Sequence, residues 1–222
     1  MDTGVSAIGV QGPTGAAGPT GPTGPEPVIT VGSNGDWYVD GVDTGKPAQG
    51  PAGTSAIVPF ASGLPADISM LLAGLAGIPE FLGFGMSSPG VSALGTTINF
   101  TGGTLTNFAF TVPRNGTLTD IAGTFNIIAG ASVGSMNPTI YVYRAPANSD
   151  NFTQLTGAKL VLPDIGLLAI DATVTGTISN VNAPITAGDR LLVVAAATSA
   201  DGLTLAGTAT GYISAGLGLA FA

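Results

Sequence analysis

Residues 9–26 read GVQGPTGAAGPTGPTGPE, six consecutive triplets that each begin with glycine. The repeat glycines are Gly9, Gly12, Gly15, Gly18, Gly21 and Gly24. Only glycine fits at the axis where three polyproline-II chains meet, and proline in the second position pre-sets the backbone φ angle. A flexible Gly/Pro linker is the plainer alternative, but a linker has no reason to keep a period of three. The period predicts a collagen-like triple-helical stalk over residues 9–27.

Six triplets are few for a stable triple helix, so another part of the chain must hold the three strands together. Thr14, Thr20 and Thr23 occupy the third, outward-facing position of their triplets. They are candidate O-glycan acceptors, against the plainer interpretation of solvated polar positions. Residues 1–8 lack the positive and apolar segments of a secretion signal. We expect this N-terminal peptide to serve as an anchor or as a connector that docks into the next trimer of a head-to-tail fibre.

The segment after the stalk, residues 28–40, has two β-rich runs on either side of Asn34-Gly35, the strongest short signal for a β-hairpin. We expect a hairpin module and neck over residues 28–53, in which residues 50–53 (GPAG) resemble one more triplet. Asp36, Trp37 and Asp40 are a candidate ligand face for a sugar or a cation. The preferred alternative is that Trp37 packs the hairpin, against its symmetry mates around a three-fold axis.

From Thr54 onward the pattern is all-β. Apolar and Thr-rich positions alternate over residues 108–112 and 168–178, as expected for strands with one buried face. Further strands are predicted over residues 96–101, 117–128, 138–144, 159–162, 190–198 and 203–213. Turn signals separate them at residues 114–116, 148–150, 187–189 and 201–202. About eight strands at this spacing indicate a sandwich or jelly roll over residues 54–222, which we call the head.

Two stretches of the head are too apolar for strands with one solvated face: residues 191–197 (LLVVAAA) and 215–222 (AGLGLAFA). Strands buried on both faces read this way. The sequence suggests that these strands face the partner subunits of a homotrimer. Residues 70–84 are compatible with either a short helix or an irregular apolar loop.

The composition argues against catalysis and against several kinds of partner. The chain of 222 residues has no His and no Cys, and its formal net charge is −8. Imidazole-dependent triads and zinc sites are therefore excluded within one chain. Asp164 and Asp171 could be imagined as an acid/base couple, but solvated turn carboxylates are the preferred interpretation. We expect no enzyme activity, no cofactor, no bound metal, no nucleic-acid partner and no membrane span.

Three stretches carry a resemblance to a known family: residues 57–63 (IVPFASG), 82–85 (LGFG) and 108–116 (FAFTVPRNG). Residues 189–194 (DRLLVV) and 211–216 (GYISAG) agree with it. The chain resembles the C-terminal domain of the BclB-type exosporium glycoproteins, collagen-like proteins of spore-forming bacteria. The resemblance implies a trimeric jelly roll of the TNF/C1q-like kind, displayed on the extracellular spore surface and held by a spore-coat or exosporium anchoring protein. It implies no catalytic residues.

The sequence therefore predicts a structural, self-assembling surface protein: a homotrimer with a collagen-like stalk, contributing to exosporium filaments or to fibres stacked through the N-terminal peptide. The alternative is an adhesin or lectin-like tip that recognises glycans or host surfaces. Jelly rolls host such sites, but the sequence offers few clustered aromatic and acidic residues beyond the hairpin.

Overall fold

The computed structural model describes residues 4, 9–49, 54–100, 105–131, 134–166, 170–199 and 206–221. The chain divides into two compact units, Met1–Ala52 and Gly53–Ala222. The N-terminal peptide, apart from Gly4, and the extra triplet at residues 50–53 lie outside the described residues. So do parts of three predicted strands, residues 101, 168–169 and 203–205.

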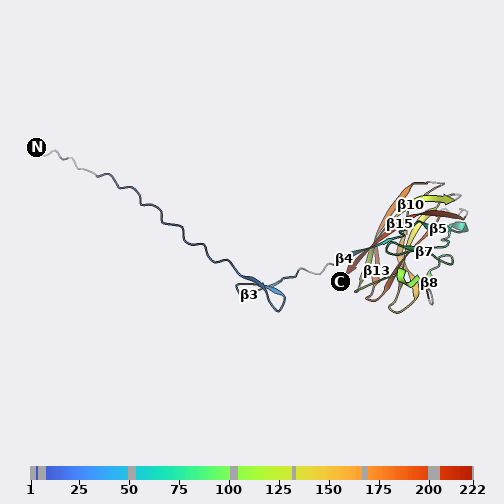
Figure 1. Ribbon diagram of the computed structural model, residues 1–222, viewed down its shortest axis with the longest axis horizontal. Coiled ribbons are helices and arrows are strands. Elements are labelled where there is room, and N and C mark those ends of the chain that lie inside the picture. The colour runs from blue at the N-terminus through green and yellow to red at the C-terminus, as the bar shows by residue number, and fades with distance from the viewer. Residues whose placement is uncertain are drawn as a thin grey trace. The chain divides into compact units, whose positions relative to one another are not determined.

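The first unit holds the glycine repeat and a small antiparallel sheet. The repeat is extended, exposed backbone without helical or strand pairing in the single chain. The sheet has the order β1-β2-β3, with β1 at Ile29–Val31, β2 at Asp36–Val39 and β3 at Val42–Pro47 (Figure 1). The hairpin predicted around Asn34-Gly35 is confirmed, because β1 and β2 pair antiparallel on either side of it. The third strand was not predicted.

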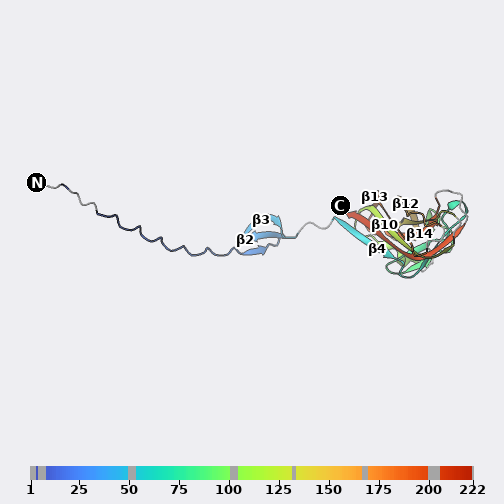
Figure 2. The same ribbon diagram turned by 90° about the horizontal axis from the view of Figure 1, so that it is seen from above.

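The head is built from two sheets, and the first has the order β13-β10-β15-β4, with β5 also paired to β15. Its long central strands are β10 and β15, which run antiparallel beside one another (Figures 1 and 2). The bounds of these five strands are β4 Ser55–Ala61, β5 Ala66–Met70, β10 Gly116–Ala131, β13 Thr173–Ile185 and β15 Gly207–Phe221.

The second sheet of the head has the order β7-β6-β14-β11-β12-β8, with β9 also paired to β14. Its centre is formed by β14 and β11, which are both almost wholly buried. The bounds are β6 Glu80–Leu82, β7 Ser87–Pro89, β8 Thr97–Asn99, β9 Phe110–Thr111, β11 Asn137–Ala145, β12 Asn151–Val161 and β14 Arg190–Thr198.

The two sheets share one hydrophobic core. The first sheet contributes Leu118, Ile121 and Phe125 of β10, and the second contributes Val142 of β11 and Val193 of β14, all of them fully buried. Residues from both inner faces meet in this way in a β-sandwich. The predicted all-β class is confirmed, and the curled sheets agree with a sandwich.

The outer face of the second sheet has a core of its own. Along β14, Leu191, Val193 and Ala195 belong to the main core, whereas Leu192 and Val194 belong to this second cluster. The other members of the second cluster include aromatic side chains from β6, from the connections before β10, and from β11 and β12: Phe81, Phe100, Phe108, Tyr141, Tyr143 and Phe152. Burial of β14 on both faces is therefore confirmed. This burial needs no partner subunit, because aromatic residues of the same chain, among them Phe81, Phe100 and Phe108, pack on that face.

In the single chain the C-terminal strand β15 is buried on one face only, and burial of its other face against partner subunits stays a prediction. Its residues alternate between buried and partly or fully exposed positions from Gly207 to Phe221. The strand reads as apolar because small residues, among them Gly216, Gly218 and Ala220, hold the outward positions. Residues 70–84 form neither a helix nor a simple loop: they contain a one-turn 3-10 helix, Leu72–Gly74, and strand β6.

The alternation read over residues 108–112 is also not that of a single strand. Phe108 ends a 3-10 turn, Leu105–Phe108, and is buried in the second cluster. Phe110 and Val112 pack against the main core instead. The chain thus crosses from one side of the second sheet to the other within five residues, which a period-two pattern cannot distinguish from a strand.

Candidate functional site

The six repeat glycines are exposed, and nothing within one chain requires them. A Cβ atom built at any of them meets no heavy atom within 4 Å, and none of the six has a positive φ angle. Neither backbone conformation nor packing within the described part of a single chain therefore explains the period of three. Thr14, Thr20 and Thr23 are exposed as well.

One face of the small sheet carries a polar network. Asn34 Nδ2 donates to Asp36 Oδ2 at 3.1 Å and to Asp43 Oδ2 at 2.8 Å. Tyr38 Oη donates to the same Asp43 oxygen at 3.2 Å, and the Gly45 N–H donates to Asp43 Oδ1 at 2.8 Å. The Gly45 amide, followed by the Asn34 and Tyr38 donors, holds the pKa of Asp43 below its ordinary value. The network fixes the carboxylates within the sheet.

The opposite face of the same sheet is apolar and uncovered. Ile29 pairs with Val39, Val31 with Trp37, and Val39 with Val42, and directly paired residues share a face. The exposed fractions are 60% for Ile29, 56% for Val31, 42% for Trp37, 38% for Val39 and 68% for Val42. We call these five residues the apolar sheet face. Five adjacent large apolar side chains thus form an exposed apolar patch on a small sheet.

The candidate ligand face Asp36, Trp37 and Asp40 is not gathered on one surface. Asp36 and Trp37 are successive residues of β2, so their side chains point to opposite faces of the sheet. Asp40 lies in the turn before β3 with a φ of 50°, and its Oδ1 accepts a hydrogen bond from the Val28 N–H at 2.8 Å. This geometry gives Asp40 a structural partner.

A groove lies on the outer side of the second sheet of the head. Its volume is about 600 Å³, and its walls come from residues 71–76 and 93–96 and from β11, β12 and the end of β14. Tyr141, Tyr143, Gln154 and Lys159 contribute polar atoms to an otherwise apolar lining. Tyr143 Oη donates to the Gly95 carbonyl at 2.5 Å.

The titratable side chains that line this groove are Tyr141, Tyr143 and Lys159. Burial raises the pKa of Tyr141 to about 12, and burial and the neighbouring Tyr141 raise the pKa of Tyr143 as well. Both hydroxyls therefore stay protonated at neutral pH and offer no phenolate base. Lys159 Nζ lies 5.6 Å from the centre of the Tyr141 ring, in range of a cation–π contact.

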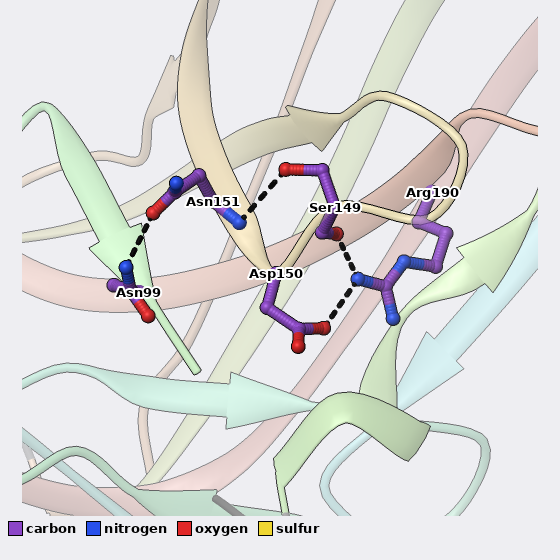
Figure 3. Close-up of polar contacts among 5 residues, drawn as sticks. All are labelled: Asn99, Ser149, Asp150, Asn151 and Arg190. Carbon is purple, nitrogen blue, oxygen red and sulfur yellow. Dashed lines mark hydrogen bonds and ion pairs between the residues drawn. The ribbon is translucent and has the colours of Figure 1, made fainter. Parts of the chain in front are cut away.

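A polar cluster around Arg190 joins strands of the second sheet (Figure 3). The Arg190 guanidinium donates to the Ser149 carbonyl and, at 2.8 Å, to Asp150 Oδ1, and it lies 5.1 Å from the Phe152 ring centre. Beside it, Asn99 Nδ2 donates to Asn151 Oδ1 at 2.5 Å. These groups pair with one another, fixing the β11–β12 turn against β14 and holding β8 to β12.

The surroundings of Asp164 and Asp171, the two carboxylates considered as an acid/base couple, indicate structural roles. Asp164 Oδ1 accepts hydrogen bonds from the N–H groups of Met136 at 2.8 Å and Gly166 at 3.0 Å. Asp171 sits in a turn with a φ of 63°. In the described ranges there is no group of three or more acidic residues that could hold a metal ion. No helix among the described residues is long and apolar enough to span a membrane.

Sequence reasoning missed β3 and the groove. The signal for β3 was present, because Asp40-Gly41 is a dipeptide typical of a two-residue hairpin turn and both residues have positive φ angles. The groove had no comparable signal, since its walls are brought together from segments up to 128 residues apart, from Leu71 to Ser199.

Comparison with known proteins gives one similarity in sequence. No protein-family model matches the chain. Collagen-like protein 1 of Acanthamoeba polyphaga mimivirus is 34% identical over 191 residues, a match that covers 80% of this chain and 20% of that protein. The chain thus spans about a fifth of the length of this relative. A chain from the crystal structure of the T13 IBDV viral particle is 8% identical, with a TM-score of 0.28 over 89% of this chain and 44% of that chain, a likeness too low to carry an argument.

Proposed function

We propose that this chain is a structural, collagen-like subunit: three copies wind their glycine repeats into a stalk and carry β-sandwich heads. The observation that carries the proposal is the strict glycine period from Gly9 to Gly24 at positions where one chain alone has no need of glycine. The requirement is then met between chains, at the crowded axis of a triple helix.

The similarity to a collagen-like protein supports this proposal. The match covers 80% of the chain, far more than the repeat itself, so it includes most of the head. A relative that is named collagen-like and resembles most of the head supports a head carried on a collagen-like stalk. A structural role also suits the groove and the Arg190 cluster, which hold no catalytic constellation in the part of the chain that is described. The trimeric TNF/C1q-like arrangement, the spore surface, an anchoring partner and fibres stacked through residues 1–8 stay predictions from the sequence.

The experiment is a matched pair of substitutions in the full-length chain, Gly15→Ala and Thr14→Ala. Both sites are exposed, and a Cβ built at Gly15 meets no heavy atom within 4 Å, so in a single-chain linker both changes are expected to be silent. In a triple helix, Gly15→Ala places a methyl group at the axis, whereas Thr14→Ala changes an outward position. We expect a mass of three 21.6 kDa chains by light scattering and a collagen-type circular dichroism transition that only Gly15→Ala lowers. Equal transitions for both variants would refute the proposal.

A second candidate function, ligand recognition by the head, rests on the groove over Tyr141. A mostly apolar groove of about 600 Å³ with a few polar groups falls in the size range of small-ligand sites. Glycan-array binding that is lost on Lys159→Ala and kept on Trp37→Ala would favour the groove. Loss on Trp37→Ala alone would place recognition on the small sheet instead, and no binding by the full-length chain would remove this candidate.

A further inference from the structure

We infer that the apolar sheet face packs against the same face of two further copies of this chain, forming a three-fold β-clamp directly after the stalk. This inference rests on the proposed trimeric function and names what holds the short triple helix together. It assigns a role to Trp37 and to β3, neither of which takes part in the stalk or the head.

The two faces of the sheet differ in how completely their groups are satisfied. On the polar face, Asp43 accepts three hydrogen bonds, from Asn34, Tyr38 and Gly45. On the apolar face, all five large side chains are at least 38% exposed. A three-stranded sheet of this size needs a hydrophobic face packed against something to be stable in water. The single chain leaves that requirement open on one side only.

The position of the sheet in the chain indicates which molecules cover the apolar sheet face. The last triplet ends at Glu26, and β1 begins at Ile29. Three chains leaving a triple helix are still within reach of one another after two residues, because each residue spans at most about 3.6 Å. Three copies of the apolar sheet face are thus delivered to the same place, in the same orientation and at high effective concentration.

The charges of the sheet permit this packing. The carboxylates of Asp36 and Asp43 belong to the polar face, so apolar faces from three chains can meet without burying them. Asp40 is bonded to the Val28 amide in the turn. The buried centre of the clamp then consists of β-branched side chains and Trp37, which pack well on pleated surfaces.

The clamp explains how six triplets suffice. A triple helix of this length is marginal alone, but strands held together at one end form it as an intramolecular event. The clamp also fixes the alignment of the three chains along the stalk, because the three apolar sheet faces pack together only when equivalent residues lie at the same height along the three-fold axis. The stalk is then held together by the small sheets and does not depend on the shape of the head.

Trp37 is the only tryptophan of the chain, so its fluorescence reports on this face alone. In the full-length trimer we expect blue-shifted emission and severalfold weaker quenching by acrylamide than in the urea-unfolded chain. The double variant Val31→Thr with Val39→Thr keeps β-branched residues but makes the face polar. We expect it to lower the melting temperature of the collagen-type signal and to red-shift Trp37. The matched control Thr30→Ser changes the opposite face and leaves both readings unchanged.

The outcomes distinguish a failure of the β-clamp from a failure of the proposed collagen-like trimer. A mass of three chains with Trp37 quenched as strongly as in the unfolded chain would overturn the clamp and leave the collagen-like trimer standing. A mass of one chain would overturn both, whether Trp37 is shielded by the chain's own head or open to solvent. A trimer in which the double variant melts like the control would also overturn the clamp.

Discussion

The side chain of Phe152 tests whether the second sheet is covered by its own chain. Phe152 is fully buried in the outer cluster, with the Phe100 ring centre at 5.4 Å and the Arg190 guanidinium 5.1 Å from its own ring centre. Replacing a buried phenylalanine by alanine removes its burial and leaves a cavity, which costs about 3–5 kcal/mol. That is a large share of the roughly 5–15 kcal/mol that stabilises a typical domain.

The contributions to this cost can be separated with two further variants. Phe152→Leu keeps much of the apolar volume but removes the ring pair and the cation–π contact, which contribute about 0.5–1.5 and about 0.5–2 kcal/mol. We therefore expect an intermediate loss of about 1–3 kcal/mol by the same principles. Phe100→Ala, made alone and together with Phe152→Ala, should show a coupling free energy of about 0.5–1.5 kcal/mol, because the two rings are in contact.

The assay is urea unfolding of the full-length chain followed by far-ultraviolet circular dichroism, at one protein concentration for all variants. The control is Val91→Ala, in the same covering segment but 96% exposed, which should change the free energy of unfolding by less than about 0.5 kcal/mol. A loss below about 1 kcal/mol for Phe152→Ala, or additive effects of Phe100 and Phe152, would refute the packing of Phe100 against Phe152 on the outer face of the second sheet.

Three further predictions concern Glu80, Asp43 and Gly63. Burial raises the pKa of Glu80, so its folded-state pKa exceeds its unfolded value. Its contribution to stability is therefore present below the ordinary pKa of 4.5 and is lost as the pH rises through the folded-state pKa. Glu80→Gln should raise the melting temperature at pH values above the folded-state pKa and remove this part of the pH dependence of stability. The pKa of Asp43 is lowered, so its contribution to stability is present above the ordinary pKa of 3.8 and is lost as the pH falls through the folded-state pKa. Acid should therefore red-shift the emission of Trp37, and Asp43→Asn should abolish this acid transition. An unchanged transition in Asp43→Asn would contradict the role of Asp43. Gly63 has a φ of 70°, and a Cβ built there meets the Gly85 carbonyl, whereas Gly85 has a φ of 95° and open space around its Cβ position. Gly63→Ala should therefore lower the urea midpoint more than Gly85→Ala, which has only the backbone cost of about 1–2 kcal/mol. Equal effects of the two substitutions would rule out the close approach of Gly63 to the Gly85 carbonyl.

Local signals were sufficient for the small elements of the chain. Asn34-Gly35 predicted the hairpin because a tight turn with positive φ depends on few neighbouring residues. Asp40-Gly41 carries equal information about β3, because this dipeptide is typical of the same kind of tight hairpin turn. The alternation over residues 173–178 was confirmed, with exposed threonines and partly buried apolar residues in turn.

Burial of β14 on both faces was predictable from its sequence, but the identity of the cover was not. A run such as residues 191–197 says that both faces are dry and nothing about which segment keeps them dry. The cover comes from Phe81, Phe100 and Phe108, which lie in or beside short elements far from β14 in the sequence. The groove over Tyr141 escaped prediction for the same reason, because its walls come from long-range pairing of β11, β12 and β14.

The pairing of β4 with β15 determines how the head responds to mechanical force. The two strands run antiparallel from Ser55 opposite Ala220 to Ala61 opposite Ser214, and the Phe221 N–H donates to the Thr54 carbonyl at 2.7 Å. The chain thus enters the head beside its own last strand (Figure 1). Tension on Thr54, with the far end of the sandwich held, pulls β4 lengthwise along β15. Every rung of the ladder then carries load at once, and the head resists pulling until the whole strand slides free.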